Sequence, residues 1–144
     1  MSGFSLKLTR DDVTKDLQKA MGKVKNATPL LRAVGIGLVG LTKETFNNAS
    51  LRPMPWVNKK DGTPSTLKSR EASLWRSIKV QAVTGKSVLI GSDKPYAAIH
   101  HLGGVSRPMP ERPYFPFFRN QLTKPGKQRM KDIIEDYMEL GKSR

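Results

Sequence analysis

The sequence lacks cysteine and has few of the residues that build catalytic or metal sites. The absence of cysteine excludes disulfides, thiolate nucleophiles and cysteine metal ligands. The chain's two histidines, His100 and His101, are adjacent, and neighbouring side chains diverge in a helix or a strand, so they make a poor ligand pair. The 12 acidic residues are scattered rather than clustered as a metal-dependent nuclease requires. We therefore predict that the protein is not an enzyme and uses no metal or cofactor.

Long apolar runs are also absent. The longest strongly apolar window, residues 30–41, contains Arg32 and three glycines. It is shorter than the roughly 20 residues that a membrane-spanning helix needs. The N-terminal segment lacks the apolar core of a signal peptide. We therefore expect a soluble protein with no membrane partner. With 144 residues the chain is predicted to be a single domain, 1–144, whose thin core neighbouring subunits could complete.

Negative charge is scarce, because 26 Lys and Arg residues against 12 acids give a net charge of +14. This excess must face water, an acidic protein or a nucleic acid. Residues 49–73 combine basic side chains with three prolines and no apolar period, so they are predicted to form a long, flexible basic loop within the domain. Its candidate contacts with DNA or an acidic partner are Lys59, Lys60, Lys68 and Arg70.

Apolar spacing predicts three helices. Apolar residues three and four positions apart indicate helices over residues 10–25, 29–48 and 125–140. Thr28 is the predicted N-cap of the second helix, and Gly141 is predicted to end the third.

Alternating apolar and polar residues predict strands over residues 4–8 and 78–82, and the apolar run at residues 88–90 predicts a third over residues 87–91. The last two are expected to form a hairpin around Thr84, Gly85 and Lys86, so the Gly-Lys-Ser sequence there is interpreted as a turn rather than a phosphate loop. The predicted fold class is therefore α+β, a small and mainly antiparallel sheet packed with two or three helices.

Glycines in the second helix and one tryptophan leave two alternatives open. Gly35, Gly37 and Gly40 each cost about 1 kcal/mol in a helix relative to alanine, which suggests close contact with another element. That element belongs either to the same chain or to a neighbouring subunit. Trp56 stands alone in the polar loop and either anchors the loop to its own domain or docks on a neighbour. Gly37, Gly40 and Trp56 are thus candidate assembly contacts.

The most distinctive segment, residues 96–118, combines a Tyr-Ala-x-x-His-x-x-Gly-Gly run with a later Pro-x-Arg-Pro-aromatic run. The positions are Tyr96, Ala97, His100, Gly103, Gly104, Pro110, Arg112, Pro113 and Tyr114. The segment resembles the signature block of the phage virion morphogenesis (tail-completion) family, which includes Mu-type tail-completion and neck proteins of tailed phages. The resemblance covers roughly residues 46–118, and His101 stands where members often have Gln.

Local roles in this segment follow from its residue types. Its prolines exclude a regular helix after residue 107, whereas residues 96–102 are predicted to be a short helical or extended segment. His100 is expected to hold local structure by hydrogen bonding. Arg112 is expected to pair with a buried acid or a helix C-terminus, or alternatively to contact a partner or nucleic acid.

The resemblance implies an assembly subunit of the virion, acting in tail completion or head–tail joining as a neck or tail-terminator protein. Such proteins commonly form rings, so the implied partners are further copies of the chain and other neck or tail proteins. A ring around a DNA channel would explain the basic excess and the thin core, so passing genomic DNA is a further expected partner. The implied location is the head–tail or tail-end region, with the host cytoplasm during assembly. Tyr114, Phe115 and Phe117 are further candidate assembly contacts. The alternative is a freestanding DNA-binding protein without sequence preference.

Overall fold

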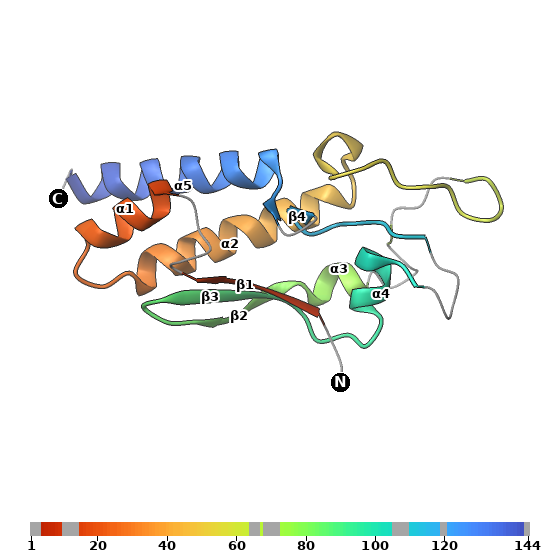
Figure 1. The fold of residues 1–144 in the computed structure, drawn as a ribbon, viewed down its shortest axis with the longest axis horizontal. Helices are drawn as coiled ribbons and strands as arrows, with labels where there is room; N and C mark the ends of the chain where they lie inside the picture. The colour runs from red at the N-terminus through yellow and green to blue at the C-terminus, as the bar shows by residue number, and fades with distance from the viewer. Residues whose placement is uncertain are drawn as a thin grey trace.

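The computed structural model describes residues 4–9, 15–63, 67, 73–104, 110–118 and 121–142. Its main elements form three layers (Figure 1), in which helix α2 lies between a sheet and an outer pair of helices. The main elements are β1 (Phe4–Thr9), α1 (Lys15–Lys23), α2 (Thr28–Thr45), β2 (Lys79–Val83), β3 (Ser87–Ser92) and α5 (Lys124–Lys142). The shorter ones are η1 (Ala49–Leu51), α3 (Ser73–Ser77), α4 (Ala97–Leu102), β4 (Phe117–Phe118) and β5 (Gln121–Leu122). The α+β prediction is confirmed.

The sheet is antiparallel throughout, with the strand order β1-β3-β2. Leu6 pairs with Ile90 and Leu8 with Val88, and all four side chains are buried. This alternation is what directs one face of the sheet toward α2. The predicted hairpin between β2 and β3 is confirmed, and its turn is held by the Thr84 hydroxyl, which accepts from the amides of Lys86 and Ser87 at 3.1 Å each.

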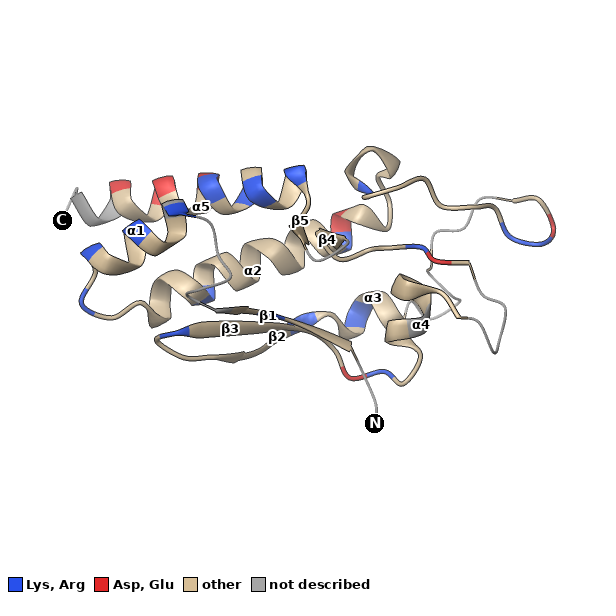
Figure 2. Cartoon of the chain, in the orientation of Figure 1, with Lys and Arg blue, Asp and Glu red and all other residues tan. Residues whose placement is uncertain are grey.

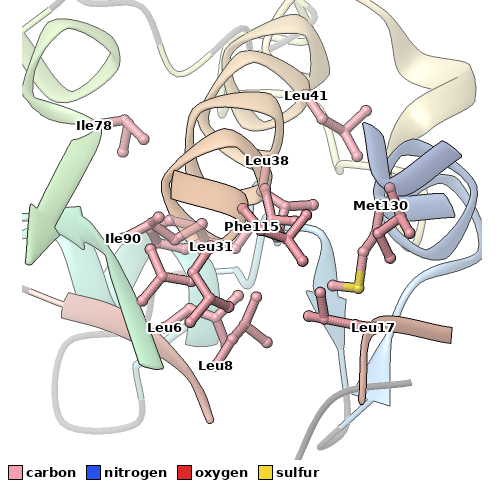
Figure 3. Close-up of a cluster of buried hydrophobic side chains, with 14 of the residues drawn as sticks. Leu6, Leu8, Leu17, Leu31, Leu38, Leu41, Ile78, Ile90, Phe115 and Met130 are labelled. Carbon is pink, nitrogen blue, oxygen red and sulfur yellow. The ribbon is translucent and has the colours of Figure 1, made fainter. Parts of the chain in front are cut away.

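Helix α2 is buried on more than one side because it contacts both the sheet and α5. Figure 3 shows Leu31 and Leu38 of this helix lying among side chains from the sheet and the outer helices. The two hydroxyls that this burial encloses, those of Thr42 and Thr45, donate to the carbonyls of Leu38 and Leu41 at 2.7 and 2.8 Å. Each of these buried hydroxyls therefore has an acceptor.

The structure corrects two predicted helix caps, and α2 and α1 end at Thr45 and Lys23, before the predicted ends at residues 48 and 25. Thr28 is the first residue of α2 rather than its N-cap, which is Ala27, and the Asn26 side chain accepts from the Thr28 amide at 3.0 Å. Gly141 does not end α5, which continues to Lys142. A glycine ends a helix by adopting positive φ, and among the described residues only Gly62 and Gly103 are glycines that do so. The predicted start of the first helix, residues 10–14, lies outside the described residues.

The glycines of α2 have different surroundings inside the chain. A Cβ on Gly35 would lie 2.7 Å from Val88 of the sheet, and one on Gly37 would overlap Ile133 of α5. A Cβ on Gly40 would meet only Arg129, at 3.8 Å. The close approach at Gly35 and Gly37 is therefore to other elements of the same chain.

This difference predicts opposite effects for two otherwise identical substitutions. Gly37→Ala should lower the free energy of unfolding by about 1–2 kcal/mol, because Ile133 must move from its packed position. Gly40→Ala should raise it by up to about 1 kcal/mol, since alanine favours the helix and finds ordinary contact distances. Urea unfolding of the two variants provides the measurement, and equal effects of both would contradict the packing described for α2 and α5.

Candidate functional site

The distinctive segment folds so that α4 is fastened to the proline-rich residues that follow it. The Tyr114 hydroxyl donates to the carbonyl of Ala97 at 2.6 Å, and the Arg112 amide donates to the carbonyl of His100 at 2.8 Å. Gly103 adopts φ +76°, which permits the chain to turn immediately after α4. The prolines forbid a helix here, so the backbone finds its partners on α4 instead.

The ring that organises this junction is that of His101. Its Nδ1 accepts hydrogen bonds from the amides of Tyr114, at 3.1 Å, and Phe115, at 3.3 Å. The ring is 4% exposed and packs against Phe4, Tyr114 and Phe115, with centroid distances of 5.2, 5.2 and 5.7 Å. Burial lowers the pKa of His101 to about 4. The imidazole is therefore neutral at pH 7, and Nδ1 is free of a proton and available as an acceptor.

His100 has a different environment from the one expected. Its carbonyl accepts the Arg112 amide, but its buried Nδ1 has no partner among the described residues. Burial, and secondarily the charge of Arg112, lowers the pKa of His100. His100 thus holds the local structure through its carbonyl, while among the described residues the side-chain nitrogen that bonds this junction is Nδ1 of His101.

Trp56 attaches the basic loop to this junction. Its side chain is 9% exposed, and its indole N–H donates to the carbonyl of Pro113 at 3.0 Å. The indole meets the ring of Phe46, at the end of α2, edge to face at 6.1 Å. Trp56 therefore anchors the loop to its own domain, which is one of the two alternatives predicted for it.

Two arginines complete the base of the loop. Arg112 donates from Nε to the carbonyl of Val57, at 3.1 Å, and from a terminal nitrogen to that of Asn58, at 3.3 Å. Arg52 donates to the carbonyls of Thr45 and Phe46, both at 3.0 Å, and its guanidinium lies 3.7 Å from the centroid of the Trp56 ring. Arg52 thereby satisfies carbonyls at the C-terminal end of α2. We call Arg52, Trp56 and Arg112 the loop clamp.

The loop clamp fastens the first part of the predicted basic loop, residues 49–73, to the rest of the domain. Residues 52–58 run along the body, whereas the turn at residues 59–63 projects away from it (Figure 1). In that turn the Lys59 amide donates to the Thr63 carbonyl, and the Asp61 carboxylate accepts the Thr63 hydroxyl at 2.6 Å. Lys59 and Lys60 are exposed at its tip. The other two basic candidates, Lys68 and Arg70, lie outside the described residues.

Most of the side chains named as assembly contacts are enclosed by the chain itself. Tyr114 and Phe115 are 0% and 1% exposed, and Trp56 is almost as deeply buried. Phe117 is half-buried in β4, and Gly37 lies beneath α5. In the folded subunit, a partner cannot reach Tyr114, Phe115 or Trp56 without displacing other side chains. Their observed contacts position the loop and close the core.

The expected partners of Arg112 are also corrected, since its guanidinium binds loop carbonyls rather than an acid or a helix end. Of the remaining motif residues, Tyr96 lies edge to face against His100 at 5.8 Å, and Gly104 is partly exposed beyond Gly103. Sequence reasoning missed Arg52 and the role of His101. The signal for Arg52 was its place a few residues beyond the end of a predicted helix, where cations favour the exposed carbonyls.

Arg112→Lys should loosen the basic loop while leaving the body folded. The lysine ammonium group cannot donate to the carbonyls of Val57 and Asn58 at the same time, as the guanidinium does. We therefore expect the free energy of unfolding to fall by about 1–2 kcal/mol and amide exchange to be faster over residues 57–63. The matched control is Arg32→Lys, at an exposed position of α2. Hydrogen exchange read by mass spectrometry gives the measurement. Unchanged exchange in the loop of the Arg112 variant would contradict the clamp.

In the described part of the chain, no helix is long and apolar enough to span a membrane. The described residues also contain no group of three or more His, Asp or Glu side chains arranged to hold a metal ion. At the junction, buried polar groups fix the proline-rich segment against α4.

Comparison with known proteins identifies the family of the chain. The family model for phage virion morphogenesis matches residues 8–139. The family is one of structural and assembly proteins of the virion. Because the match covers most of the chain, the protein belongs to the phage virion morphogenesis family. No curated protein and no solved structure matches it significantly.

Proposed function

We propose that the protein is a tail-completion or head–tail joining subunit, acting in the neck or as a tail terminator, and that it assembles as a ring. The observation that carries the proposal is that the segment resembling the family's signature block holds the basic loop in place. Arg112 and Pro113 of that segment contact Asn58, Val57 and Trp56 of the loop. The segment therefore sets where the basic tip projects from the subunit.

The exposed lysines of the tip suit recognition by charge rather than by base sequence. Lys59 and Lys60 lie on a turn, without the helix that usually enters the major groove of DNA. If they line a DNA passage, their contacts are with phosphates and are independent of sequence. If they bind an acidic neighbour in the particle, salt should weaken assembly while affinity for DNA stays negligible.

The test replaces the four basic candidates together by serine: Lys59, Lys60, Lys68 and Arg70. If they contact phosphates, the slope of log affinity against log salt should become less steep by about 0.9 for each duplex phosphate that the variant no longer neutralises. If they contact an acidic neighbour, joining of tails to heads should fall, most of all at low salt. Filter binding of duplex DNA and in vitro tail joining, each across a salt series, measure the two effects.

A matched control changes four exposed lysines elsewhere to serine: Lys15, Lys25, Lys86 and Lys124. This control alters the net charge equally, so an equal effect would mean that charge alone is responsible. Loss of DNA binding with normal tail joining would favour the freestanding DNA-binding alternative. No change in either measurement would reject both contacts for the loop. Electron microscopy of particles would test the ring directly, and one copy per particle would overturn it.

A further inference from the structure

The second half of α5 carries a stripe of acids on its outer surface. The stripe consists of Asp132, Glu135, Asp136 and Glu139, all of them exposed. Their spacing of three, one and three places them on one helix face, opposite the buried Met130 and Ile134. Figure 2 shows the acidic residues of α5 gathered in the half nearer the C-terminus, after a basic first half.

Contacts within the subunit account for only part of this arrangement, since Gln128 donates to Asp132 at 2.9 Å and Glu135 shares a pocket with Lys19, Lys23 and Lys131. Asp132 and Asp136 are four residues apart, as are Glu135 and Glu139, and like charges at that spacing repel. The order of charge along α5 also opposes the helix dipole, which favours acids at the N-terminus and bases at the C-terminus. Among the described residues, the ion pair of α5 is Arg129 with Glu44 at 2.6 Å, outside the stripe.

A cleft of opposite charge lies on the other side of α2, between α3 and the turn after β3. It has a volume of about 370 Å³ and is lined by Ser73, Arg76, Ser77, Lys79, Asp93 and Lys94. Three cations thus face one carboxylate, and no ion pair forms among these described side chains. We call it the cationic cleft.

The wall of the cationic cleft is fixed by a chain of hydrogen bonds. The Ser77 hydroxyl donates to the Leu74 carbonyl at 2.6 Å, so in its 2.5 Å contact with Ser92 it must be the acceptor. Ser92, which is 1% exposed, in turn accepts from the Lys94 amide at 3.0 Å. The chain joins α3, β3 and the following turn, so the cations do not depend on a ligand to bring them together.

We infer that the cationic cleft of one subunit binds the acidic stripe of the next, an inference that rests on the proposed ring. Copies with a net charge of +14 repel unless their contact pairs opposite charges, and the stripe supplies the acids for such a contact. The two surfaces belong to different layers of the subunit (Figure 1), so pairing them gives a head-to-tail contact, the kind from which rings are built. A cleft of about 370 Å³ can receive the carboxylate side chains of a helix, whereas a DNA duplex is too wide to enter it.

The test is a charge swap measured by mixing. One variant carries Asp136→Lys with Glu139→Lys, and the other carries Arg76→Glu with Lys79→Glu. Each alone should self-associate at least about tenfold more weakly than the natural protein at low salt. An equimolar mixture should regain association, because each reversed surface then meets its complement on the other variant. Sedimentation velocity and incorporation into tails of the same phage give the readouts.

Thermal unfolding separates this contact from a purely structural role. Asp136→Lys with Glu139→Lys should raise the unfolding temperature of the monomer, since lysines there suit both the helix dipole and the acids four residues earlier. The matched control, Lys25→Glu with Lys86→Glu, changes the charge as much as the cleft variant does and should associate normally.

Four outcomes would overturn the inference. Single variants that still assemble, or mixtures that do not recover, would reject the contact and leave the proposed ring standing. Loss of DNA binding by the cleft variant alone, with no rescue on mixing, would assign the cleft to phosphates instead. A natural protein that forms no oligomer in solution or on tails would remove the ring together with the contact.

Discussion

Trp56→Ala should lower the free energy of unfolding by about 3–5 kcal/mol. The substitution removes a ring that is 9% exposed and packed edge to face against Phe46. It also leaves the Pro113 carbonyl without its donor and Arg52 without the ring over which it lies. Because these interactions join the loop to the end of α2 and to the proline-rich segment, they should disappear together. Chemical unfolding followed by circular dichroism measures the effect.

Trp56→Phe is the control that separates packing from hydrogen bonding. Phenylalanine keeps an aromatic ring against Phe46 but cannot donate to Pro113, so the loss should be smaller, about 1–2 kcal/mol. Both variants should speed amide exchange over residues 57–63. A Trp56→Ala protein of natural stability would show that the loop base contributes little to the fold.

Acid should destabilise the protein through His101. Its pKa is about 4 in the folded chain, below its ordinary value of 6.5, so between these values the unfolded chain binds a proton that the folded chain does not. Neutral, buried His101 therefore adds about 3 kcal/mol to the free energy of unfolding above pH 6.5, and this contribution is lost as the pH falls toward 4. His100 acts in the same direction, because burial lowers its pKa as well.

His101→Gln isolates this contribution, since a glutamine oxygen can also accept from the amides of Tyr114 and Phe115 but does not titrate. At pH 7 the variant should be the less stable protein, because it lacks the ring that packs on Phe4. Toward pH 4 the difference from the natural protein should shrink by up to about 3 kcal/mol. Unfolding in urea from pH 7 to pH 4 gives both curves. Parallel curves would refute the neutral, buried state of His101.

Regular elements were predictable where a short-range pattern determines them. Alternation located β1 and β2, a short apolar run located β3, and apolar spacing located α2 and α5. The failure at Gly141 has a simple cause: the sequence shows a glycine but does not show the φ that it adopts. Thr28 was displaced by a single position because Asn26 supplies an acceptor that also suits a helix start.

The candidate site was predictable as a segment but not as a set of contacts. The sequence singled out Trp56 and Arg112 as residues with a partner, and the structure gives them partners 57 and 55 positions away. No spacing rule connects positions so distant, because their contact depends on how the end of α2 packs against the proline-rich segment. The same limit hid the difference between His100 and His101, which lie side by side in the sequence but in different surroundings.

The loop clamp also has a consequence for the order of folding. It joins Trp56 to Pro113 across 57 positions, so its contacts require a long stretch of chain to be closed first. The hairpin between β2 and β3 and the turns of α2 need only neighbours along the chain. We therefore expect the clamp to close late, after the sheet and α2 have met. A subunit whose clamp has not yet closed would then lack a fixed basic tip, so under the proposed function it would join the particle only after folding is complete.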